Sequence, residues 1–210
     1  MADITGFVAG YMVGSVPVGL LLGRAARGLD VRDFGSGNIG ATNVYRIMGP
    51  AAGALTFAMD VGKGAAAVRL ARGFGADRTG QAAAGFAAVV GHSWPAFARF
   101  RGGKGVATGF GGLLLVSREA SAFAVVGGLS ALAATRIVSV GSLSAGASAT
   151  FGAALRRMRS GDMVPLAFAA LTTTLLAVRH GDNLRRLAHG QEPRVSLRRS
   201  ADAQGATDRN

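Results

Sequence analysis

Long apolar runs separated by short charged segments dominate this sequence of 210 residues. Half of the residues are hydrophobic, only 16% are charged, and the mean hydropathy is +0.34. A helix that crosses a lipid bilayer needs about 20 consecutive, mostly apolar residues. The runs therefore predict an all-α, polytopic integral membrane protein with about seven transmembrane helices. These helices are expected at residues 4–23, 51–71, 79–98, 105–117, 120–135, 138–155 and 162–179. The fourth and fifth are short and could form one bent hairpin.

The charged segments indicate how these helices are oriented. The segments 24–50, 99–104, 136–137 and the residues after 179 are separated from one another by two runs each, so they share one side of the membrane. This side carries most of the arginines, and basic loops favour the cytoplasm. The sequence thus predicts an N-terminus outside and a C-terminus in the cytoplasm. The arginine cluster at 156–159 falls on the opposite side and runs against the trend.

The first run has three informative features. Asp3 stands where a signal peptide would carry basic residues, and no small-residue cleavage site follows, so the run is predicted to stay as a transmembrane helix. Pro17 is expected to kink or break this helix, because proline removes a helix hydrogen bond. Small residues four positions apart let helix backbones approach closely. Such pairs are Gly10 with Gly14 and Gly19 with Gly23.

The charge distribution bears on domains and partners. Residues 1–193 are predicted to form one transmembrane domain, and residues 194–210 a basic, disordered cytoplasmic tail. A net charge of +12 would suggest nucleic acid in a soluble protein. Here the basic residues lie in loops and the tail, where membrane orientation and anionic lipid headgroups account for them. No nucleic-acid partner is therefore expected.

The sequence offers no pattern for a metal or a cofactor. It has no cysteine, which excludes thiolate ligands and a cysteine nucleophile. Its three histidines show neither an H-E-x-x-H pattern nor a carboxylate cluster beside them. Gly35, Gly37 and Gly40 satisfy G-x-G-x-x-G, but a dinucleotide site needs a preceding strand, and no alternating α/β pattern surrounds them. We expect neither a metal nor a cofactor.

The glycine-rich stretch 35–43 lies in a polar segment between two apolar runs. Glycine is kept where the chain bends sharply or comes close to a ligand, and such loops turn backbone N–H groups toward anions. Two interpretations stay open: a loop that faces a ligand, or a tight re-entrant turn capped by serine and asparagine. In the first, the donors are Ser36, Asn38, Thr42 and Asn43.

The only two lysines each stand between glycines. Lys104 follows Gly102 and Gly103 just before an apolar run, a place that suits an oxygen anion at a helix start. The alternative is an interfacial lysine that extends toward the headgroups. Lys63 lies deeper in its run, one turn after Asp60, which predicts an ion pair that faces a cavity or the bundle interior.

Two histidines end apolar runs on the predicted cytoplasmic side. A lone histidine is more often structural, and this is expected of His92. His180 is a stronger candidate for a functional site, because Asn183 follows it at one-turn spacing. Ser139 and Ser142 share a face at the start of the sixth run, where serines often bond back to their own helix.

Taken in order, these motifs resemble those of the bacterial acyl-phosphate-dependent glycerol-3-phosphate acyltransferases, small polytopic enzymes that begin phospholipid synthesis. The resemblance extends to about residue 193, and several ordered motifs are far more specific than any single one. It is carried by Gly14–Pro17, Gly35–Asn43 with Arg46, Asp60, Lys63 with Gly64, Gly91–Pro95, Gly102–Thr108, Ser139–Ser142, and His180 with Asn183, Arg186, Leu187, Gly190 and Glu192.

The resemblance implies transfer of a fatty acyl group from acyl phosphate to the 1-hydroxyl of sn-glycerol 3-phosphate, giving lysophosphatidate and phosphate. It also implies a multi-pass protein of the bacterial inner membrane whose site faces the cytoplasm. Catalytic roles are implied for Ser36, Lys104, His180 and Asn183. Binding of the phosphates and of the oxyanion is implied for Gly37, Asn38, Thr42, Asn43, Arg46, Gly102, Gly103 and Ser142.

The chemistry suits these residue types. Acyl phosphate is a mixed anhydride whose leaving group is stable, so the site needs cations and oriented N–H groups more than a carboxylate pair. Our hypothesis is that Arg46 and Lys104 hold phosphates while the 35–43 loop stabilises the oxyanion. The attacking hydroxyl loses its proton either to His180 or to a substrate phosphate, and we favour the phosphate.

Two other classes of protein fit parts of the pattern. A transporter for a phosphorylated solute would bind its anion with the same chemistry, although the sequence has no convincing internal repeat and its motifs gather on one side. A helix-packing scaffold would explain the glycines but not the polar side chains of the loops. Without the resemblance, the residues do not decide between an enzyme and a transporter.

Overall fold

A computed structural model describes residues 1–195. Within this range the chain is helical and contains no strand, which confirms the predicted all-α class. The helices are α1 (Ala2–Gly14), α2 (Val18–Arg27), α3 (Ala41–Met48), α4 (Pro50–Gly73), α5 (Arg78–Ser93), α6 (Val106–Val116), α7 (Arg118–Thr135), α8 (Val138–Ser160), α9 (Val164–Arg179) and α10 (Gly181–Ala188), with short 3-10 turns at Val31–Asp33 and Ala96–Ala98.

The seven apolar runs all fall on helices, and the structure adds two helices that the runs did not predict. These are α3 and α10, each of eight residues, in polar segments. The runs at 105–117 and 120–135 form two helices that meet at Ser117, whose side chain accepts a hydrogen bond from Ala120 N–H at 3.2 Å. A disordered tail was predicted for residues 194–210. Most of it, residues 196–210, lies outside the part of the chain that the structure describes.

Length and composition single out fewer membrane-spanning helices than the runs predict. Within residues 1–195, two segments are long and apolar enough to cross a bilayer: Ala2–Arg27 and Val138–Ser160. A third is obtained if α9 and α10, which meet at a bend of 62°, are taken as one broken span. The count of seven spans therefore stays a prediction.

Pro17 interrupts the first predicted span, as expected from its missing N–H group. Helix α1 ends at Gly14 and α2 begins at Val18. The carbonyl of Val16 in this break accepts a hydrogen bond from Lys63 Nζ on α4 at 3.0 Å. A buried side chain thus stabilises the interrupted helix from a neighbouring one.

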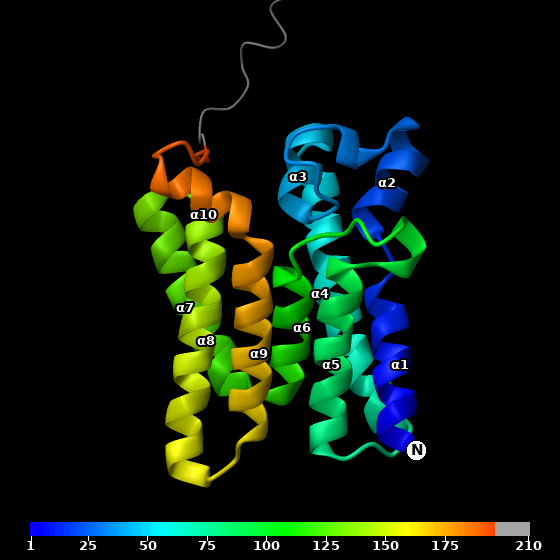
Figure 1. Cartoon of the computed structure of the whole chain (residues 1–210), viewed down its shortest axis with the longest axis vertical. Coiled ribbons are helices and arrows are strands. Elements are labelled where there is room, and N and C mark those ends of the chain that lie inside the picture. Colours follow the sequence, from blue (N-terminus) through cyan, green and yellow to red (C-terminus); the bar gives the residue numbers. More distant parts are fainter. Residues whose placement is uncertain (196–210) are drawn as a thin grey trace, which may run out of the picture.

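The long helices lie roughly parallel, and the chain forms two adjoining groups, α1 to α6 and α7 to α10 (Figure 1). Gly10 and Gly14 of α1 lie so close to α5 that a Cβ atom on either would overlap the α5 backbone, at Ala84 and Ala88. The close helix contact predicted for this pair is confirmed. Gly19 and Gly23 serve another purpose, because they face the segment that follows α2 rather than another long helix.

A small apolar cluster anchors the glycine-rich loop to the end of the bundle. Leu20 of α2, Val31, Ile39, Val44 of α3 and Ala98 are all at most 4% exposed and pack together. Burying a side chain such as leucine, isoleucine or valine contributes about 1.5–3 kcal/mol. The loop between α2 and α3 is therefore fixed from both of its ends. This end of the molecule, opposite Met1, also carries α10 (Figure 1).

Candidate active site

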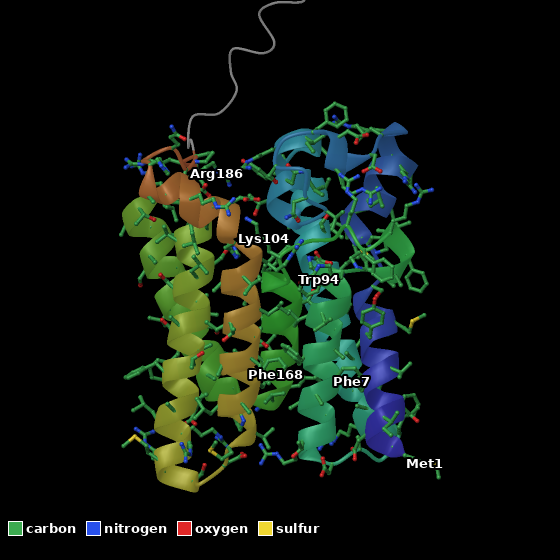
Figure 2. The ribbon with its side chains drawn as sticks, viewed as in Figure 1. Met1, Phe7, Trp94, Lys104, Phe168 and Arg186 are labelled. Atoms are coloured by element: carbon green, nitrogen blue, oxygen red, sulfur yellow. The ribbon has the colours of Figure 1, made fainter. Side chains whose placement is uncertain are left out.

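A cavity of about 460 Å³ opens at the end of the bundle that lies opposite the N-terminus. Figure 2 shows Lys104 and Arg186 at this end, and Phe168 about halfway along the bundle. The walls come from the 35–43 loop, α3, the starts of α6 and α8, and the junction of α9 with α10. The polar and charged residues that line it are Ser36, Asn38, Thr42, Asn43, Arg46, Asp60, His92, Lys104, Ser139, Ser142, His180, Asn183, Arg186 and Glu192.

Asn43 is the residue that shapes the glycine-rich loop. Its side chain is 2% exposed. Its Oδ1 accepts from Ser36 N–H at 2.9 Å, and its Nδ2 donates to the carbonyls of Val31 at 2.9 Å and Asn38 at 2.8 Å. Gly35 adopts a φ of 61°, which suits glycine. The Asn43 amide is thus occupied by the backbone of its own loop, as in the interpretation of a tight turn held by asparagine. The interpretation of a loop that faces a ligand stays a prediction.

The remaining loop residues divide between the cavity and the turn. Asn38 Oδ1 accepts from Gly40 N–H at 3.1 Å and so holds the turn that precedes α3. Ser36 and Thr42 are exposed and line the cavity. Arg46 follows Thr42 by one helical turn on α3, which places both side chains on one face of that helix.

Lys104 reaches across the cavity toward α10. Its Nζ donates to Asn183 Oδ1 at 2.5 Å. The pKa of this ammonium group is lowered to about 8, mainly by burial. The charges of Arg186, Arg46 and Arg179 contribute to this lowering, while that of Glu192 opposes it. Lys104 is therefore a cation whose charge is easily lost unless an anion stabilises it.

Three glycines predicted to bind substrate lie outside the cavity lining, within the described residues. These are Gly37, Gly102 and Gly103. The pair before Lys104 is explained by packing instead. A Cβ on Gly102 would overlap the His92 carbonyl oxygen, and one on Gly103 would overlap the His92 ring. These glycines allow the loop to lie directly on His92.

Glu192 organises the side of the cavity formed by α8 and α10. Its Oε1 accepts from Asn183 Nδ2 at 2.5 Å and from Ser139 Oγ at 2.7 Å. Its Oε2 accepts from Arg186 Nε at 2.8 Å. Burial works against ionisation, but these three hydrogen bonds outweigh it and lower the pKa of Glu192. Glu192 is thus a carboxylate that holds neighbouring side chains.

Glu192 and its partners Ser139 and Arg186 were not among the predicted site residues. A lone glutamate beyond the last apolar run carries no local signal of a site. Its presence among the ordered motifs of the resemblance was the one signal that could have identified it.

His180 sits at the junction of α9 and α10 and is only 1% exposed. Its Nδ1 lies 2.7 Å from the carbonyl oxygen of Leu176, one turn earlier. A carbonyl only accepts, so Nδ1 carries the proton of this contact and Nε2 is left as the acceptor of the neutral ring. Ser142 lines the cavity from α8, one turn after Ser139.

The buried ion pair predicted between Asp60 and Lys63 is present. Lys63 Nζ lies 2.9 Å from Asp60 Oδ1. Asp60 lines the cavity, which fits the prediction that this ion pair faces a cavity or the bundle interior. His92, which was expected to be structural, lines the cavity as well. Among residues 1–195, no three His, Asp or Glu side chains gather closely enough to hold a metal ion.

The family model for glycerol-3-phosphate acyltransferase matches residues 4–190 of this chain. Relatives of the same name include a protein from Anaeromyxobacter sp. (strain Fw109-5), 44% identical over 90% of this chain and 94% of that one. Another, from Parasynechococcus marenigrum (strain WH8102), is 40% identical over 89% of this chain and 86% of the relative.

Two solved structures also match. One is the crystal structure of PlsY (YgiH), an integral membrane glycerol 3-phosphate acyltransferase, in its glycerol 3-phosphate form, with a TM-score of 0.85 and 34% identity over 93% of this chain and 96% of that one. Its lysophosphatidic acid form gives a TM-score of 0.82 and 32% identity, with the same coverage. The helical fold, the cation-lined cavity and these relatives agree, and the chain belongs to the glycerol-3-phosphate acyltransferase family.

Proposed function

We propose that this protein transfers a fatty acyl group from acyl phosphate to the 1-hydroxyl of sn-glycerol 3-phosphate. The products are lysophosphatidate and inorganic phosphate. The observation that carries the proposal is the cavity, in which Arg46, Lys104 and Arg186 converge from three different elements. Two phosphate groups have to be held side by side in such a reaction, and several cations with few free carboxylates suit that task.

The balance of charge in the cavity supports binding of two phosphate-bearing substrates. Two carboxylates line it, and both have partners: Glu192 is bonded by three side chains and Asp60 is paired with Lys63. No free carboxylate of the described lining is thus left to repel a phosphate. The donor's leaving group is a stable phosphate, so stabilising the developing oxyanion is the main requirement. Removing one oxyanion donor typically costs about 10²–10³ in rate.

The step conserves atoms and charge as follows. The 1-hydroxyl oxygen attacks the acyl carbonyl carbon, the bond from that carbon to the phosphate oxygen breaks, and phosphate leaves with the electron pair. The hydroxyl proton passes to a phosphate oxygen of the substrates. Arg46, Lys104 and Arg186 hold the phosphates, while Ser36 and the N–H groups of its loop face the oxyanion.

His180 and Asn183 both line the cavity beside this step. Asn183 bridges Lys104 and Glu192, and we assign it to holding Lys104 in place against the phosphates. The His180 ring is fixed by its contact with the Leu176 carbonyl, and we assign it to the wall of the site. If a His180→Gln enzyme binds glycerol 3-phosphate normally but loses more than about 10³-fold in kcat, His180 is the base instead, since general bases contribute about 10²–10⁴.

The acyl chain needs an apolar path that begins at the cavity. A smaller pocket of about 50 Å³ lies among α6, α7, α8 and α9, and Val106 and Ser142 line both this pocket and the cavity. Its deeper residues include Leu113 and Phe168, which are apolar. We assign the first part of the acyl chain to this path.

We further propose that residues 1–193 form one multi-pass unit with seven spans in the bacterial inner membrane. In this arrangement α1 and α2 cross together, the N-terminus is outside, and the cavity faces the cytoplasm. The placement of Met1 and Lys104 at opposite ends of the bundle supports it (Figure 2). So does the excess of arginine in the segments around the cavity.

A phosphate-release assay on purified protein tests the choice of donor. Palmitoyl phosphate is supplied with and without glycerol 3-phosphate, and palmitoyl-CoA serves as the control donor. We expect release that depends on glycerol 3-phosphate and needs no added metal. Turnover of palmitoyl-CoA alone would contradict the proposed donor.

A further inference from the structure

Asp60, Lys63 and His92 form a buried cluster of ionisable side chains beside the cavity that the proposed chemistry does not use. Their exposed fractions are 2%, 7% and 3%. Lys63 Nζ lies 2.9 Å and His92 Nδ1 3.5 Å from the same oxygen, Asp60 Oδ1. Buried ionic groups of this kind are weak contributors to stability, because desolvation offsets their attraction. Asp60 and His92 also line the wall of the cavity, and this position calls for a functional explanation.

His92 connects this cluster to the loop that carries Lys104. Its backbone oxygen accepts a hydrogen bond from Gly103 N–H at 2.9 Å. Its ring lies so close to Gly103 that a Cβ there would overlap Nε2. The Nδ1 edge of the ring faces Asp60. The imidazole is therefore enclosed by Asp60 on one edge and by Gly103 on the other.

Gly103 is also held from the opposite side. Arg179 Nε donates to the Gly103 carbonyl at 3.1 Å, and the Arg179 guanidinium lies 5.2 Å from the centre of the Trp94 ring. Gly103 is thus fixed at both its N–H and its carbonyl, and the next residue is Lys104. From this fixed point the Lys104 side chain extends to Asn183.

We propose that Asp60 and His92 are positioning residues for acyl transfer. Asp60 orients the His92 ring, the ring holds Gly103, and Gly103 aims Lys104 at the substrate phosphate. The inference rests on the phosphate-binding role proposed above for Lys104. Neither residue touches the reacting atoms in this account. Their effect is geometric, and a misplacement of about 1 Å can cost about 10² in rate.

The test compares variants of the purified full-length enzyme with palmitoyl phosphate and glycerol 3-phosphate. We expect His92→Gln to lower kcat/KM by about 100-fold, as expected for a misplaced group, at an unchanged melting temperature. Asp60→Asn alone would leave Lys63 without its ion-pair partner. The double variant Asp60→Asn with Lys63→Met removes both charges, and we expect the same loss of kcat/KM from it. Thr56→Val is the matched control.

Thr56 lies on α4 one turn before Asp60 and is fully buried, but it bonds to the Ala52 carbonyl of its own helix and does not line the cavity. Its substitution removes a buried polar group of the same helix without touching the His92 contact. We expect normal kinetics from Thr56→Val.

A pH profile separates positioning from a merely structural role. The low pKa of Lys104 depends on its buried place. Asn183 accepts its hydrogen bond, and the charged and titratable groups around it are Glu192, Arg186, Arg46, Arg179 and His180. If His92→Gln releases Lys104 toward water, the alkaline limb of kcat/KM moves to higher pH, whereas Thr56→Val leaves it in place.

Three results would overturn the proposal: normal activity of His92→Gln, a loss of activity that accompanies unfolding of both His92→Gln and the double variant, or a loss with an unmoved alkaline limb. The unsubstituted enzyme is assayed in parallel. If it is inactive with palmitoyl phosphate, the proposed function fails, and this inference fails with it. If it is active and His92→Gln matches it, the positioning role alone is wrong.

Discussion

Lys104 is held at the cavity by both its neighbours and its partner Asn183. Replacing Lys104 by alanine is expected to lower kcat by at least about 10²–10³-fold, because a group that stabilises developing charge is worth that much. Activity with palmitoyl phosphate measures the effect. Arg101→Ala is the matched control, since Arg101 is an exposed cation three residues earlier that does not line the cavity. If the two variants have comparable activity, Lys104 has no role in catalysis.

The pKa of Lys104 gives a direct pH prediction. Burial lowers it from 10.5 to about 8, so the group is charged below that pH and neutral above it. A neutral amine cannot hold a phosphate as an ion pair. In the free enzyme kcat/KM should therefore fall as the pH rises through about 8. Lys104→Arg keeps its charge across this range, because an arginine in a protein stays protonated, and should lose this limb. If kcat/KM begins to fall only near the ordinary lysine pKa of 10.5, the lowered pKa of Lys104 is contradicted.

At the scale of single residues, the local sequence pointed to Lys104 and to His180 with Asn183, and the resemblance added Arg46. All four residues line one cavity. The local sequence did not predict Glu192, because its role is set by hydrogen bonds from three side chains that come together only in the fold.

The glycines of the predicted site show the same division. In the sequence, Gly102 and Gly103 resemble a phosphate-binding loop. In the structure, the backbone and ring of His92 occupy the space that a side chain at either position would need. Asn43 was expected as a ligand donor, and its amide is occupied by the loop it supports. The packing role of these glycines and the loop-holding role of Asn43 are both set by tertiary contacts.

Among the elements, the contact of α1 with α5 depends on a missing side chain. A Cβ at Gly14 would overlap the Ala88 carbonyl of α5, so Gly14→Ala forces the two helices apart. Overpacking of this kind typically costs about 1–3 kcal/mol. The melting temperature in detergent should fall. Gly62→Ala on α4 is the control, since a Cβ there meets no atom within 4 Å. Equal melting temperatures for the two variants would contradict the packing.

The long helices were predictable because each of them falls on an apolar run of the sequence, and the break at Pro17 followed from proline chemistry. Helices α3 and α10 were not, because each is eight residues long and lies in a polar segment. Short helices of this kind are stabilised by the surface they pack on, which no local pattern encodes. These two helices carry Arg46 and Asn183, so the missed elements are the ones that shape the site.

For the whole molecule, the proposed orientation can be tested with single cysteines, because the chain has none of its own. Arg101→Cys is near the cavity, and Ser160→Cys is at the opposite end of the bundle, where α8 ends (Figure 1). A membrane-impermeant maleimide should label Ser160→Cys in intact spheroplasts and Arg101→Cys only in opened ones. The reverse pattern would contradict an N-terminus outside the cell.

The central claim is that this cavity joins an acyl phosphate to glycerol 3-phosphate. The most direct measurement is the conversion of radiolabelled glycerol 3-phosphate by purified protein with palmitoyl phosphate as the only acyl donor. The account predicts one lysophosphatidate, acylated at the 1-hydroxyl, for each phosphate released. Folded protein that forms no lysophosphatidate, or forms it only from palmitoyl-CoA, would contradict it.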